Sequence, residues 1–134
     1  MTTTEPTTIP SVGQGDLDFI FGSWIVHNRK LLDATDPNCH EWTEFQTTSR
    51  TEPVLFGLSH VERIYADAVE GADAWEGFTL RQFDPAESVW RIWWASTRSP
   101  GKLDAPLVGR FVEGVGEFFG DDTVNDRAIK VRFE

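Results

Sequence analysis

The chain has 134 residues, of which 40% are hydrophobic and 25% charged, a balance typical of one globular domain. Its 22 acidic against 12 basic side chains give a net charge of −10, which disfavours phosphate backbones and anionic lipid surfaces as partners. The single cysteine, Cys39, excludes an internal disulfide, and no run approaches the roughly 20 apolar residues of a membrane-spanning helix. We therefore expect a cytoplasmic protein that binds neither nucleic acid nor membrane.

The N-terminal residues differ in character from the rest of the chain. Residues 1–15 are rich in Thr and Pro and lack hydrophobic periodicity, which predicts a disordered arm. They have neither the basic start nor the apolar run of a signal peptide. The piece DLDFIF at 16–21 is too short for a stable α-helix and suits one 3₁₀ turn docked on a core. One domain is then expected over residues 16–134.

From Trp24 onward the chain consists of short runs rich in Val, Ile, Phe, Trp and Thr, separated by turn-forming clusters. This pattern predicts β-strands over residues 24–32, 42–51, 59–66, 75–83, 89–97, 107–112, 115–119 and 128–133. Glu113-Gly114 and Asn125-Asp126 fit tight hairpin turns. No window has apolar residues at helical spacing. Eight short strands with short connections therefore predict an antiparallel up-and-down β-barrel, with a two-sheet sandwich as the competing architecture.

Alternation along each strand predicts which side chains face the interior. Trp90, Ile92 and Trp94 are expected to face inward together, and Trp93 outward. Trp24 and Trp90 are expected to be buried core residues. Candidates for inward-facing polar groups are Asn28, Glu44, Arg81, Arg110 and Glu117; the alternative places these side chains on the solvent face. An Arg and a Glu in a dry interior would pair, because an unpaired buried charge is costly.

Several segments carry a family resemblance. The Gly22-x-Trp24 step resembles the opening of lipocalins, fatty-acid-binding proteins and nitrobindin-like barrels. Five segments resemble a bacterial calycin-like family of unknown function: DFIFGSWIVHNRKL, EWTEF, GFTLRQFDP, VWRIWWASTRSP and VGRFVEGVGEFFGDDT. The resemblance implies a calycin barrel and no agreed activity. Members of that family continue past Phe133 with a further hairpin, so it also implies a barrel incomplete at the C-terminus. Either the chain is truncated relative to that family, or the open edge would be covered by the N-terminal arm or by a second copy, in a homodimer.

Motifs for metal or nucleophilic chemistry are weak. His27, His40 and His60 lie on separate elements without the spacing of a zinc site, and we expect loop or surface histidines and no metal. Cys39 beside His40 in a loop does not form a catalytic dyad. A haem, as in nitrobindin-like barrels, has no motif behind it, and the cofactor is unknown.

Three functions remain open. The first is binding of a small hydrophobic or aromatic molecule, with Trp24, Asn28, Arg81 and Trp94 near the cavity. The second is an isomerase, cyclase or dehydratase with Glu44 or Glu117 as acid/base and Arg110 as anion stabiliser. The third is a structural or interaction role for a filled barrel. An internal void above about 300 Å³ would favour the first two, and a carboxylate there without an Arg partner would favour the enzyme.

Overall fold

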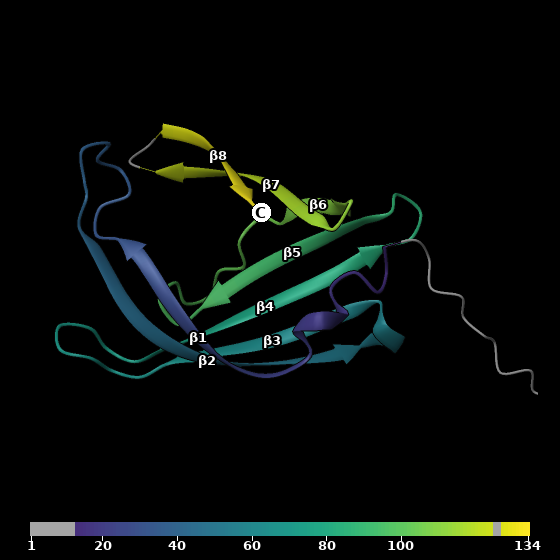
Figure 1. Ribbon diagram of the computed structural model, residues 1–134, viewed down its shortest axis with the longest axis horizontal. Helices are drawn as coiled ribbons and strands as arrows, with labels where there is room; N and C mark the ends of the chain where they lie inside the picture. Colours follow the sequence, from purple (N-terminus) through teal and green to yellow (C-terminus); the bar gives the residue numbers. More distant parts are fainter. Residues whose placement is uncertain (1–12, 125–126) are drawn as a thin grey trace, which may run out of the picture.

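One antiparallel sheet of eight strands in sequence order makes up the protein (Figure 1). The computed structural model describes residues 13–124 and 127–134. The strands are β1 (Gly22–Leu31), β2 (Trp42–Val54), β3 (Ser59–Ala66), β4 (Trp75–Asp84), β5 (Val89–Ser96), β6 (Leu107–Val112), β7 (Val115–Val124) and β8 (Arg127–Phe133). Two 3₁₀ turns, η1 (Asp18–Ile20) and η2 (Leu55–Gly57), are the only helical elements described. The predicted all-β up-and-down meander is confirmed.

The sheet curls strongly but does not close (Figure 1). Every strand pairs with its neighbour in sequence, and in the described residues no ladder joins β1 to β8. The architecture is therefore a half-barrel, which agrees with the predicted incomplete barrel. The competing prediction of a sandwich of two sheets is wrong, because all eight strands belong to one sheet. Pairing of a second copy along one of the two free edges stays a prediction. None of the described helices is long and apolar enough to cross a membrane.

The ladder register fixes which residues share the concave face. Cross-strand partners lie on the same face, and the chain of partners Ser49↔Ile64↔Gly77↔Ser96 runs across four strands of that face. Trp90 is 1% exposed and lies on the concave face. Ile92 and Trp94 follow it at every second position of β5 and therefore lie on the same face. The predicted inward orientation of Trp90, Ile92 and Trp94 is confirmed.

One end of the half-barrel is filled by a small core. Leu17, just before η1, packs with Phe83, Trp90 and Phe118 from β4, β5 and β7. The indole Nε1 of Trp90 donates to the carbonyl oxygen of Gly13 at 3.0 Å, which ties the N-terminal turn to the sheet. The predicted 3₁₀ turn is confirmed. The predicted disordered arm falls mostly on residues 1–12, which lie outside the described residues.

Tight turns connect the strands. Glu113 and Gly114 have φ values of 52° and 81°, which is the type I′ geometry that matches the twist of the paired strands, so this predicted hairpin is confirmed. Asn125-Asp126 lies outside the described residues.

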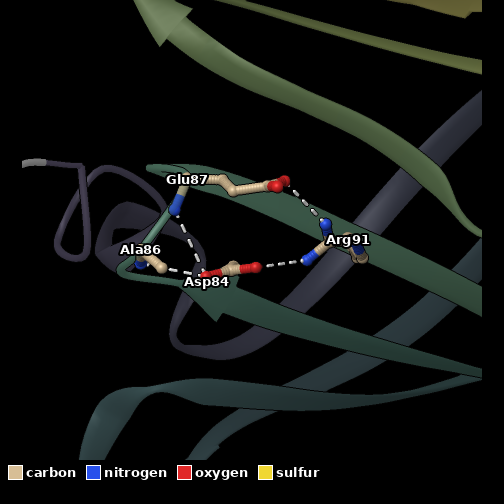
Figure 2. A network of polar contacts seen from close by, with 4 residues as sticks. All are labelled: Asp84, Ala86, Glu87 and Arg91. Atoms are coloured by element: carbon tan, nitrogen blue, oxygen red, sulfur yellow. Dashed lines mark hydrogen bonds and ion pairs between the residues drawn. The ribbon is translucent and has the colours of Figure 1, made fainter.

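A compact polar network holds the β4–β5 turn (Figure 2). Oδ1 of Asp84 accepts the backbone N–H groups of Ala86 and Glu87 at 2.9 and 3.3 Å. The guanidinium of Arg91 donates to Asp84 Oδ2 at 2.9 Å and to Glu87 Oε2 at 3.1 Å. The hydrogen bond from Arg91 is the main cause that lowers the pKa of Asp84. This network fixes the register between the two strands that supply Arg81 and Trp94.

Candidate functional site

A cavity of about 1220 Å³ lies on the concave face of the sheet. Strands β3 to β8 and the N-terminal segment around η1 line it. Most lining side chains are apolar, among them Ile64, Ile92, Trp94, Leu107, Phe111 and Phe118. This volume exceeds the roughly 300 Å³ at which ligand pockets begin, so the interior of the half-barrel is not filled.

In the described part of the chain, one ion pair has both of its side chains in the cavity lining. Nη2 of Arg81 on β4 donates to Oε1 of Glu62 on β3, and the two side chains are only 14% and 12% exposed. The expectation that an interior Arg pairs with a Glu is confirmed for Arg81. Sequence reasoning did not choose Glu62, although alternation places it on the same face of β3 as His60. Nη1 of Arg81 is buried and has no hydrogen-bond partner in the described residues.

His60 lies opposite Arg81 in the β3–β4 ladder and is fully buried. Its ring packs between Phe21 and Trp90, with centroid distances of 4.6 and 4.8 Å, and Nε2 lies 3.8 Å from Oδ1 of Asp18. Burial is the largest cause that lowers the pKa of His60, and the charge of Arg81 lowers it further, whereas Asp18 opposes the shift. The expectation of a loop or surface histidine is wrong for His60, because η1 and its flanking residues cover that end of the sheet.

Trp94 forms part of the cavity wall and is held in place by small neighbours. A Cβ atom on Gly77 would lie 2.2 Å from Cη2 of Trp94, so the indole occupies space that only glycine leaves free. Trp75 packs edge-on against Trp94, with ring centroids 6.3 Å apart. Of the four predicted ligand-binding residues, Trp94 and Arg81 therefore line the cavity together.

The other two predicted ligand-binding residues lie on the concave face of β1, away from the cavity lining. Asn28 donates through Nδ2 to Thr47 Oγ1 at 3.1 Å, which satisfies its amide within the sheet. Trp24 is 45% exposed, and its Nε1 donates to the carbonyl oxygen of Ile20 at 2.8 Å. The expectation of a buried Trp24 is wrong, because the sheet stays open beside β1.

The predicted catalytic residues lie on the convex face. Glu44 faces Arg29 across β1 and β2, 3.9 Å apart, and its side chain is 76% exposed. Glu117 lies opposite Arg110 in the β6–β7 ladder and 3.3 Å from Arg132. The predicted inward orientation of Glu44, Arg110 and Glu117 is therefore wrong. Each of these side chains points to the solvent side of its strand. The side chains opposite them there carry the opposite charge.

The described residues contain no group of three or more His, Cys, Asp or Glu side chains that could hold a metal ion. The cavity offers an apolar wall, one indole face, one ion pair whose two charges compensate each other, and exposed carboxylates at its rim.

The chain was compared with family models, curated proteins and solved structures. No family model, no curated protein and no solved structure matches the chain. The resemblance to calycin-like barrels therefore stays a prediction.

Proposed function

We propose that the protein binds a small apolar molecule in the cavity on the concave face of its sheet. The observation that carries this proposal is an unfilled volume of about 1220 Å³ with a mostly apolar wall. Ligand pockets of proteins share this composition, with a few polar groups set among hydrophobic and aromatic side chains. Transfer of an apolar ligand from water to this wall is favourable at about 25 cal/mol per Å² of buried apolar area.

Binding is favoured over acid–base catalysis by the state of Glu62, the one largely buried carboxylate among the described lining residues. The other acidic side chains of the lining, Asp104, Asp121, Asp122 and Glu134, are exposed to water at its rim. Glu62 already accepts a hydrogen bond from Arg81, and both side chains are largely buried. A general base needs a carboxylate that is free to take a proton from a substrate. The pairing of Glu62 with Arg81 supports a role in shaping the cavity.

Titration with Nile red, an uncharged dye whose emission rises in apolar surroundings, tests the proposal. We expect saturable emission with one site per chain, together with quenching of the protein's tryptophan fluorescence. Substitution Trp94→Phe should remove most of that quenching, because Trp94 lines the cavity.

The matched control is Trp42→Phe. Trp42 is 46% exposed and does not belong to the described cavity lining; Cζ of Arg29 lies 4.2 Å from the centroid of its ring. This variant should keep the quenching of the unmodified protein. Emission that never saturates, or equal loss of quenching in both variants, would refute binding in the cavity.

A further inference from the structure

The charges that line the cavity are unbalanced. Among the described residues of the lining, Arg81 is the one basic side chain, whereas the acidic side chains are Glu62, Asp104, Asp121, Asp122 and Glu134. At the rim, Asp121 lies 3.4 Å from Lys130, and Glu134 contacts Arg132. Asp104 and Asp122 form no ion pair in the described residues. The described lining therefore carries a net negative charge, most of it on exposed side chains at the rim.

The single base inside is already neutralised. Arg81 and Glu62 are 14% and 12% exposed, so each depends on the other for compensation of its charge. A ligand carboxylate that approached Arg81 would either displace Glu62, leaving that side chain unpaired, or lie beside it as a second negative charge. Both arrangements are unfavourable in a partly dry site, because like charges repel more strongly where water is excluded.

An apolar wall accepts the hydrocarbon part of a ligand whatever its headgroup, so the headgroup decides the selectivity. We infer that the cavity selects uncharged apolar molecules and rejects the corresponding carboxylates, and that Glu62 imposes this selectivity by holding Arg81. This inference rests on the proposed binding function and goes beyond it by naming the class of ligand. The specificity-determining residue is Glu62.

Displacement of Nile red by two ligands with the same hydrocarbon chain, methyl octanoate and octanoate, tests the inference. The protein should bind the ester at least about tenfold tighter than the carboxylate at neutral pH, a ratio that corresponds to about 1.4 kcal/mol. In Glu62→Gln the free Arg81 should attract the carboxylate, so we expect octanoate to gain about tenfold while the ester changes less than about threefold.

The matched control is the corresponding pair on the convex face. Nε of Arg63 lies 2.7 Å from Oε1 of Glu76, and these residues belong to the same two strands. Glu76→Gln should leave the ester-to-carboxylate ratio unchanged. A measurement that needs no variant is octanoate binding at about pH 5, where protonation of the ligand should raise its affinity toward that of the ester.

The outcomes separate this inference from the proposed function. Equal affinity for ester and carboxylate, or an unchanged ratio in folded Glu62→Gln, would overturn the inference while leaving apolar binding intact. An octanoate affinity that does not rise at about pH 5, while ester binding persists, would overturn it as well. Failure of both ligands to displace the dye would overturn the proposed function and the inference with it.

Discussion

The indole of Trp94 on β5 rests against Gly77 on β4, at a spacing that no other residue at position 77 would allow. A Cβ atom there would lie 2.2 to 2.9 Å from three ring atoms of Trp94. The same arrangement recurs further along the sheet, where a Cβ atom on Gly116 would lie 2.8 Å from the ring of Phe111. Glycines on the concave face therefore determine how the aromatic walls of the cavity are oriented.

Substitution Gly77→Ala should force the Trp94 indole away from its position. We expect the free energy of unfolding to fall by about 1–3 kcal/mol, the usual cost of overpacking, and Nile red to bind more weakly. Urea denaturation and dye titration measure the two effects. Gly15→Ala is the control, because its nearest atom would be 3.4 Å from the new Cβ. Equal stability of both variants would contradict this packing.

The buried ion pair should show strong coupling in a double-mutant cycle. Arg81→Met alone leaves the Glu62 carboxylate largely buried without its partner, and should lower the free energy of unfolding by roughly 3 kcal/mol. Glu62→Leu combined with Arg81→Met should recover most of that loss. The same cycle on Arg63 and Glu76, which are more exposed, should give a coupling below about 1 kcal/mol. Similar couplings for the two pairs would show that the interior pair is solvated.

The buried histidine should make stability depend on pH. His60 has a lowered pKa in the folded state, so below about pH 6.5 the unfolded chain takes up a proton that the folded chain resists. The free energy of unfolding should be highest above that pH and fall between about pH 6.5 and 5, at no more than about 1.4 kcal/mol per pH unit.

Replacement of the histidine tests the origin of that slope. His60→Leu should flatten it, because no titratable group remains between Phe21 and Trp90. His27→Gln, at an exposed position on β1, should keep the slope of the unmodified protein. An unchanged slope in His60→Leu would assign the pH dependence to other groups.

The turn between β2 and β3 carries backbone strain. Phe56 has a φ of 53° and is fully exposed, a conformation that asparagine tolerates far better than an aromatic residue. Phe56→Asn should therefore raise the thermal midpoint, with a gain in the free energy of unfolding of up to about 1 kcal/mol. A lower midpoint would mean that the Phe56 ring makes contacts that stabilise the turn.

The strand positions could be predicted from the sequence because each run carries β-branched and aromatic residues and ends in turn-forming residues. Residues 59–66 and 107–112 were predicted with the bounds that the structure shows. Strand β2 extends beyond the predicted end at 51, through Pro53, because it stays paired with β3 as far as Val54. Strand β1 pairs with β2 only as far as Thr51. The missing N–H of Pro53 therefore costs no bond to β1.

The concave face of β2 explains why part of the candidate site was placed wrongly. Its buried residues are Thr47, Ser49 and Thr51, so hydrophobic alternation does not distinguish its two faces. Alternation along β2 therefore does not reveal that Glu44 lies on the convex face. The burial of His60 depends on η1, a segment about 40 residues earlier in the chain, and no local pattern encodes that contact.

Isoleucine methyl resonances during titration with methyl octanoate test the binding proposal most directly. Ile64 and Ile92 line the cavity, whereas Ile25 is 65% exposed on the convex face of β1. Binding in the cavity predicts saturable shifts of the Ile64 and Ile92 methyl groups and none at Ile25. Shifts that are largest at Ile25, or spectra that stay unchanged up to the solubility limit of the ester, would contradict it.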